Sequence, residues 1–238
     1  MRGRAARRVE SDALLVRTVA YGESDVIATL FTREEGKVSA IVRGGRKSTR
    51  RVGGALEPMH TMRAAWEDRA TELVTLKEAR VVRVRAGLTA RLEALDAAGK
   101  ALRWVRHVCP PRTPEPGVWE AITRLLDALD RGDAPEPALA VFGLALVGEI
   151  GWAPDLERCV RCGKLCPADR PAAFDAARGG LVCQSCGGAP RVMGPPVRAL
   201  ALACMHTGRA PEDAPAAHWA ELLAILGEVM AAHAGVEA

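Results

Sequence analysis

Four of the seven cysteines form two short motifs in the C-terminal half of the chain. The motifs are Cys159-Val160-Arg161-Cys162 and Cys183-Gln184-Ser185-Cys186; each is followed by glycine, and 20 residues separate them. A C-x-x-C turn supplies two of the four soft ligands that zinc arranges in a tetrahedron. Because this spacing is typical of four-cysteine zinc sites, the sequence predicts one structural Zn²⁺ bound by Cys159, Cys162, Cys183 and Cys186.

The glycine after each motif, Gly163 or Gly187, can adopt positive φ, and its N–H could then point at a thiolate sulfur without a Cβ clash. Two other interpretations of the motifs stay open at this point. The site could be empty or hold another soft metal such as iron, or the thiols could form a redox pair. Catalytic zinc is disfavoured, because four thiolates close the coordination shell and leave no place for water.

The other three cysteines are expected to stay outside the site. Cys166 follows Cys162 by four residues and could compete as a ligand, but the second motif completes the set without it. Cys109 and Cys204 lie in helical patterns and are expected to be small buried residues. The basic N-terminus precedes no apolar signal block, so we expect no export, and therefore thiols or metal ligands in place of disulfides.

A second group of residues suits the binding of phosphates. The segment 43–51 contains five cations and no acid: Arg43, Arg46, Lys47, Arg50 and Arg51. Glycines flank it and strand-like segments lie on both sides, which predicts an exposed basic loop. We expect these five residues to contact DNA, with Arg17, Arg33 and Lys37 as further contacts. The alternative is a solvated charge run without a partner.

This interpretation predicts a strong dependence of binding on salt. With five phosphate contacts on a single strand, the logarithm of the binding constant should fall with the logarithm of the salt concentration, with a slope of about 3.5 in magnitude. Replacing the five loop residues by Glu should abolish binding to single strands and leave the fold intact. Tyr21, Phe31 and Trp66 are the aromatic residues of this region, and Phe31 is expected in the core. Binding should therefore depend on charge more than on base stacking.

The distribution of charge along the chain supports the same partner. Residues 1–85 carry a net charge of +7 and the remainder carries −3. A basic N-terminal module favours a polyanionic partner for that part of the chain. No apolar run reaches the roughly 18 residues of a membrane span, and we expect a cytoplasmic, nucleoid-associated protein.

No catalytic motif is present in the sequence. The five histidines are scattered, and the H-E-x-x-H, G-x-S-x-G and clustered D-x-D patterns are all missing. Although an active site can assemble from distant residues, we expect no enzyme and no catalytic residue.

The first 80 residues contain five short segments with the polarity of strands, separated by turn-forming residues. The expected strands are 13–20, 26–32, 37–43, 60–66 and 72–77. Five strands in this length suit an OB-fold, the commonest nucleic-acid-binding barrel of this size, although a generic five-stranded barrel is an alternative.

Helical periodicity dominates after Val84. The expected helices are 88–109, 118–130, 137–150, 196–206 and 216–233. The prolines of 110–117 predict a stiff linker. The fold class is thus α+β and multidomain, with an OB-fold at 1–80, helical parts at 81–155 and 191–238, and a zinc-binding segment at 156–190.

Several blocks of the N-terminal region resemble the bacterial DNA repair family RecO. They are the segments 13–18, 21–25, 30–37 and 53–58, which read ALLVRT, YGESD, LFTREEGK and GGALEP. The helices and the two C-x-x-C motifs match as well, so the resemblance covers essentially the whole chain.

This resemblance implies an OB-fold followed by a helical domain with a zinc-binding region. It implies a recombination mediator that binds single- and double-stranded DNA and anneals complementary strands. It also implies that the protein, with RecR, helps RecA load onto DNA coated by single-strand-binding protein. The acidic, hydrophobic tail of that protein should then bind a groove of the helical part, beside an Arg or Lys.

Two other functions remain as alternatives. A zinc-ribbon regulator of duplex DNA would need a recognition helix with exposed Arg, Asn or Gln, which neither C-terminal helix offers. A repair scaffold that binds no DNA would use the charge for solubility alone.

Overall fold

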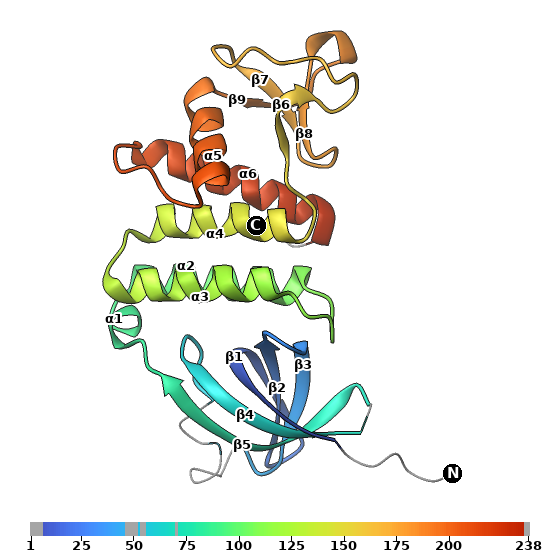
Figure 1. Ribbon diagram of the computed structural model, residues 1–238, viewed down its shortest axis with the longest axis vertical. Coiled ribbons are helices and arrows are strands. Elements are labelled where there is room, and N and C mark those ends of the chain that lie inside the picture. Colours follow the sequence, from blue (N-terminus) through green and yellow to red (C-terminus); the bar gives the residue numbers. More distant parts are fainter. Residues whose placement is uncertain (1–6, 46–51, 53–55, 70, 236–238) are drawn as a thin grey trace. The chain divides into compact units, whose positions relative to one another are not determined.

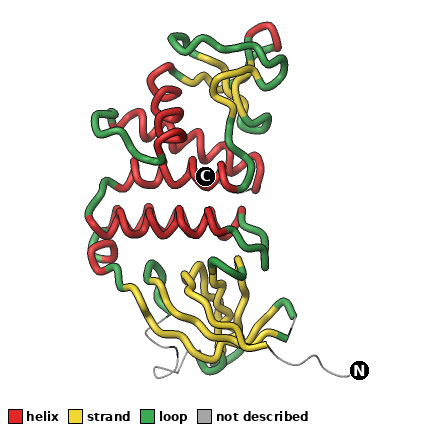
Figure 2. The backbone as a smooth tube through the Cα atoms, viewed as in Figure 1, coloured by secondary structure: helices red, strands yellow, loops and turns green. Residues whose placement is uncertain are grey.

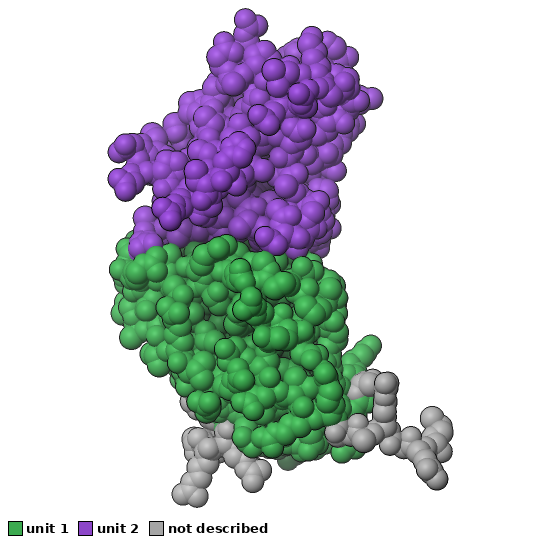
Figure 3. Space-filling view, in the orientation of Figure 1, with its two compact units in different colours: residues 1–132 green, residues 133–238 purple. Residues whose placement is uncertain are grey.

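The computed structural model describes residues 7–45, 52, 56–69 and 71–235. The chain divides into two compact units, Met1–Gly132 and Asp133–Ala238 (Figure 3). Among the described residues, the first unit contains a β-barrel and three helices, and the second contains three helices and a small sheet (Figures 1 and 2).

The strands and helices have the following bounds. The strands are β1 Arg7–Tyr21, β2 Asp25–Thr32, β3 Gly36–Val42, β4 Thr61–Asp68, β5 Leu73–Arg83, β6 Asp155–Cys159, β7 Ala172–Asp175, β8 Gly180–Val182 and β9 Arg191–Met193. The helices are α1 Ala86–Thr89, α2 Leu92–Val108, α3 Pro116–Arg131, α4 Pro135–Glu149, α5 Pro195–Thr207 and α6 Ala216–Ala234, with a 3₁₀ turn at Gln184–Cys186.

Strands β1 to β5 close into a barrel in the order β1-β2-β3-β5-β4, in which β3 runs parallel to β5. This order, with a short parallel pair between the third and fifth strands, is OB-like, as expected. Alternate residues point inward, and Leu15, Leu30, Val38 and Trp66 are among the side chains of the buried core. Burial of each large apolar side chain contributes about 1.5–3 kcal/mol, so the barrel has a core of its own.

The first expected helix is broken into two. Residues 88–109 do not form one helix, because Arg91 is extended (φ −125°, ψ 121°) between α1 and α2. Asp130 Oδ1 accepts the N–H groups of Gly87 and Leu88 at 2.9 and 3.1 Å, and the Arg91 guanidinium donates to Leu129 O. These bonds dock α1 on the end of α3. As a result Leu92 is 74% exposed.

The proline-rich connection between α2 and α3 is more than a linker, because it packs on the barrel. Arg112 N–H donates to Lys37 O at 2.9 Å, and its guanidinium donates to Asp68 Oδ2 at 2.9 Å. Gly36 has φ +64°, and a Cβ there would lie 2.0 Å from Thr113 O. Only glycine therefore allows this segment to cross β3.

Helix α4 packs against α6 and α5 in the second unit, as its nearly continuous apolar sequence predicts. Residues 150–194 form a four-stranded sheet in the order β6-β8-β7-β9. These four strands were not expected, since none is longer than 5 residues. In the described part of the chain, no helix is long and apolar enough to cross a membrane.

Candidate metal centre and nucleic-acid interface

The four cysteines of the two motifs converge at one point of the small sheet. Cys159 ends β6, and Cys183 directly follows β8, which pairs with β6. The Sγ atoms of Cys159, Cys162, Cys183 and Cys186 all lie within 4.8 Å of one another. The Cys162 and Cys183 sulfurs are 3.8 Å apart. A tetrahedron with Zn–S bonds near 2.3 Å has edges of about 3.8 Å, so the four thiols fit a zinc ion closely.

Each motif is a tight turn closed by its glycine. Gly163 (φ 72°) donates its N–H to Cys159 O at 2.8 Å, and Gly187 (φ 98°) donates to Gln184 O at 2.9 Å. Positive φ is confirmed at both glycines, but the expectation that their N–H groups point at sulfur is wrong. The N–H of Cys183 has that role, since it donates to Cys159 Sγ at 3.3 Å.

The pKa values of Cys159 and Cys186, two of the four thiols, differ. The hydrogen bond from Cys183 N–H, with further bonds from the Arg161 and Cys162 backbone, lowers the pKa of Cys159 to about 6. Hydrogen bonds with Cys183 and Cys162 raise the pKa of Cys186 to about 12. Four thiolates so close together would repel one another, and a divalent cation would relieve that repulsion.

The other cysteines lie where the sequence predicts. Cys166 is buried, outside the group of four, and burial raises the pKa of its thiol. Cys109 and Cys204 are buried, and burial raises the pKa of each, to about 12 and about 11.

Arg198, on α5, is a supporting residue that sequence reasoning missed. It is 3% exposed and donates to three carbonyls of the cysteine segment: Leu156 O at 2.5 Å, Pro167 O at 2.7 Å and Cys166 O at 2.8 Å. A buried guanidinium with three backbone acceptors is a clamp that fixes the segment on α5. Nothing in the local sequence signals it, because its acceptors lie 31–42 residues away.

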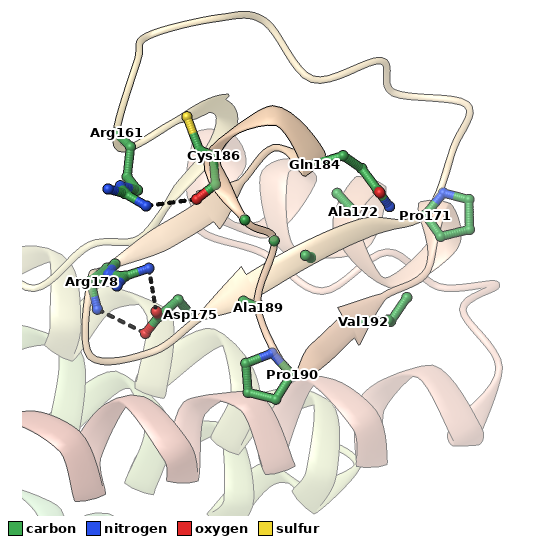
Figure 4. Close-up of a pocket in the computed structure, with 13 residues that line it drawn as sticks. Arg161, Pro171, Ala172, Asp175, Arg178, Gln184, Cys186, Ala189, Pro190 and Val192 are labelled. Carbon is green, nitrogen blue, oxygen red and sulfur yellow. Dashed lines mark hydrogen bonds and ion pairs between the residues drawn. The ribbon is translucent and has the colours of Figure 1, made fainter.

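An open depression of about 780 Å³ lies beside the cysteines (Figure 4). Its two arginines are already bound within the chain. Arg161 donates to Cys186 O at 2.6 Å, and Arg178 pairs with Asp175 at 3.4 Å. Arg161 therefore supports the second cysteine motif.

Both ends of the expected basic loop are anchored in the barrel. Asp25 Oδ1 accepts the N–H of Gly44 at 2.8 Å, and Val52 is buried in the barrel core. Arg43 is exposed at the first end. The predicted contacts Arg46, Lys47, Arg50 and Arg51 lie outside the described residues.

A β-bulge sets the direction of Arg17. In the β1–β2 pairing Leu15 lies opposite Leu30 and Arg17 lies opposite Thr29, so Val16 is an extra residue. Leu15 and Leu30 both point into the core, so Thr29 and its partner Arg17 point outward. Without the bulge Arg17 would face the core, which shows how one inserted residue re-aims a side chain.

The same register places a row of residues on the outer face of β1, β2 and β3. Tyr21 lies opposite Asp25, Val19 opposite Ile27, and Ile27 opposite Ile41. Tyr21 is 52% exposed, whereas Phe31 and Trp66 are fully buried. Tyr21 is thus the barrel aromatic, among the described residues, that a base could stack on.

Two further predicted contacts have partners within the first unit. Lys37 is half-buried, and its Nζ donates to Arg106 O near the end of α2; burial lowers its pKa. The lysine caps a carbonyl at a helix C-terminus, where a cation is favourable. Arg33 pairs with Glu120 at 2.8 Å, and both side chains are about half exposed.

The fold and the cysteine site together define a class: an OB-like barrel followed by a helical unit with four clustered thiols that could hold a metal ion. Two family models match the chain, Recombination protein O N terminal over residues 6–85 and Recombination protein O C terminal over residues 90–237.

Curated relatives agree with these matches. The DNA repair protein RecO of Anaeromyxobacter sp. strain K is 39% identical over 78% of this chain and 74% of its own. That of Myxococcus xanthus is 37% identical over 76% and 73%, and that of Pelobacter propionicus is 32% identical over 94% and 90%. The chain belongs to the RecO family of DNA repair and recombination proteins.

Proposed function

We propose that this chain is a recombination mediator that binds single- and double-stranded DNA and anneals complementary strands. The observation that supports this most directly is the outer face of β1–β3. There, exposed Tyr21 and Arg43 lie next to the anchored base of the basic loop 43–51, and exposed Arg17 lies further along the same face. In OB-folds this face of the barrel is the surface that binds oligonucleotides.

Annealing follows from neutralisation of charge. Two strands repel each other through their phosphates, and cations of the loop and barrel face lower that repulsion when both strands are bound. Complementary bases can then meet at low cost. No sequence preference is required, because the contacts are to phosphates.

The four thiols hold one structural Zn²⁺ in this proposal. The ion would supply a crosslink between the two cysteine motifs, and Cys159, Cys162, Cys183 and Cys186 would be its ligands. We also infer that RecR, single-strand-binding protein and, indirectly, RecA are partners; this inference rests on family membership.

The test is annealing of complementary oligonucleotides, bare or coated with single-strand-binding protein, across a salt series. Wild-type protein should accelerate annealing, and a fourfold rise in salt should weaken single-strand binding about a hundredfold. Replacing Arg43, Arg46, Lys47, Arg50 and Arg51 by Gln should remove most of this activity.

A matched control separates local contacts from net charge. It replaces five exposed cations of other surfaces by Gln: Arg80, Arg124, Lys164, Arg170 and Arg209. The control should anneal like wild type. Sequence-selective duplex binding would support a regulator instead, and no DNA binding at about 0.1 M salt, where surface charges still act over roughly 10 Å, would support a scaffold.

A further inference from the structure

Helix α2 separates its charges into two halves. Glu93 and Asp96 lie near its N-terminus, whereas Arg103, Arg106 and His107 lie in its C-terminal half, where no acid follows Asp96. Arg103 and His107 are exposed, and Arg106 is half-buried. The helix dipole favours cations in the last turn, but its effect falls off before Arg103. The dipole therefore accounts for only part of this arrangement.

Two cations of the barrel meet the same end of α2. Lys37, from β3, binds Arg106 O. Strand β1, which carries Arg17, packs against α2, and Arg17 contributes to the lowered pKa of His107. Neither barrel residue belongs to the helix, so the helix dipole gives no reason for their presence here.

This cluster lacks acids that would balance it. In the described part of the chain, no ion pair joins Arg17, Arg103 or Arg106 to a carboxylate. The Arg106 guanidinium lies 2.8 Å from His107 Nε2, and burial, Arg106, Lys37 and Arg17 lower the pKa of His107. Like charges from three elements cost free energy in the isolated protein, and an external anion would offset that cost.

The cluster continues the outer face of the barrel. From the β1–β2 turn, the face presents Tyr21, then Val19 with Ile27, and then Arg17 with Thr29. Beyond the bulge, Leu14 and Phe31 of the same face are buried, and Phe31 packs against Trp119 of α3 with ring centroids 6.0 Å apart. The exposed face therefore ends at Arg17, beside the C-terminal end of α2.

We propose that Arg17, Arg103, Arg106 and His107 form a phosphate-binding surface, the α2 surface, on which a single strand leaves the barrel and crosses α2. This inference rests on the proposed DNA binding and gives the strand a path beyond the OB barrel. The chemistry favours nucleic acid because the cations adjoin a face with an exposed tyrosine ring and apolar side chains, which suit unpaired bases. Lys37 orients this surface through the carbonyl of Arg106.

The experiment measures binding of a fluorescein-labelled oligothymidylate of about 40 nucleotides, longer than the roughly 4–16 that one OB barrel covers. Fluorescence anisotropy gives the affinity across a salt series. The variant carries Arg17→Gln, Arg103→Gln and Arg106→Gln, and circular dichroism checks its fold. Loss of three phosphate contacts should lower the salt slope by about 2 and weaken binding at least about tenfold at low salt.

The matched control carries Arg124→Gln, Arg170→Gln and Arg209→Gln, which remove the same charge from other exposed positions. It should keep the wild-type slope, and an equal loss in the control would overturn the α2 surface. A triple variant that binds like wild type, while the loop variant fails, would overturn this inference and leave the proposed function standing. Absence of wild-type binding would instead defeat the proposed function itself. If the triple variant kept DNA binding but lost binding of an acidic peptide, the surface would belong to a protein partner, and the inference would also be overturned.

Discussion

The barrel and the cysteine segment are both sheets, but they obtain their stability in different ways. The barrel strands are 7 to 15 residues long and close on themselves around a buried core. The strands of the cysteine segment are 3 to 5 residues long, and their large buried apolar side chains are Leu156, Phe174, Leu181, Val182 and Met193. A sheet with so small a core needs a crosslink, and the four thiols are placed to provide it through a metal ion.

Removing the metal is expected to have the largest effect. Structural zinc contributes about 10–16 kcal/mol of binding free energy in small zinc modules, and this energy is folding energy. Chelation, or Cys159→Ser with Cys183→Ser, should therefore unfold residues 155–193. Hydrogen exchange followed by mass spectrometry should show loss of protection there, and metal analysis should show loss of one zinc per chain.

The barrel provides the internal control for that experiment. Protection of β1 to β5 and binding of single strands should persist after chelation, because neither depends on the ion. Loss of barrel protection together with the cysteine segment would contradict the view that the two regions are stabilised independently.

The second prediction concerns the arginine clamp beneath the cysteine segment. Arg198→Met should lower the free energy of unfolding of the metal-bound protein by about 3 kcal/mol, since three buried carbonyls lose their donor. Arg191→Met is the matched control. Arg191 pairs with Glu228 at 2.6 Å but is partly exposed, so its loss should cost less than about 1 kcal/mol. Urea denaturation measures both free energies of unfolding. Equal losses of stability in the two variants would show that Arg198 does not support the cysteine segment more than a surface arginine does.

The sequence predicted the features that depend on local pattern. Alternating polarity predicted the five barrel strands, helical periodicity predicted the helices, and the C-x-x-C spacing predicted the group of four cysteines. Each of these patterns can be recognised within a short segment. The residues with long-range roles escaped this reasoning. Arg198 binds acceptors more than 30 residues away, and Lys37 caps a helix 69 residues further on.

The error at residues 88–109 has a physical cause of the same kind. One continuous helix at 88–109 satisfied the periodicity, but capping of α1 by Asp130 is a tertiary contact that no local pattern reveals. Arg17 was expected at the surface and lies there, but the bulge at Val16 that turns it outward could not be predicted from alternation. Register and capping by distant residues are decided when the elements pack together.

The third prediction tests whether the barrel core also serves the DNA-binding loop. Val52→Ala should lower the free energy of unfolding by about 2 kcal/mol, because it removes buried methyl groups at the point where the loop rejoins the core. It should also weaken single-strand binding a few-fold, since the loop loses one anchor. Val74→Ala removes the same groups from β5 and should cost similar stability without the loss of affinity. Equal DNA affinity in the two variants would show that the anchor at Val52 does not organise the loop.

The smallest expected effect concerns pH and His107. The pKa of His107 lies below its usual value, first because of partial burial and then because Arg106, Lys37 and Arg17 repel the imidazolium. A phosphate bound beside it would favour the charged form and raise the pKa in the complex. A group whose pKa rises on binding takes up a proton, so affinity increases as pH falls through the interval between the free and bound values.

We therefore expect binding of oligothymidylate to be about threefold tighter at pH 6 than at pH 7.5, at constant salt. His107→Gln should remove this dependence, because the remaining cations of the α2 surface stay charged throughout this range. His218→Gln, on α6, is the control and should keep the wild-type profile. An affinity of the wild type that does not change with pH would place the strand away from His107. The cysteine segment adds nothing to this pH dependence, because its proposed role is to hold structure, whereas Arg17, Arg103 and Arg106 form no ion pair with a carboxylate among the described residues.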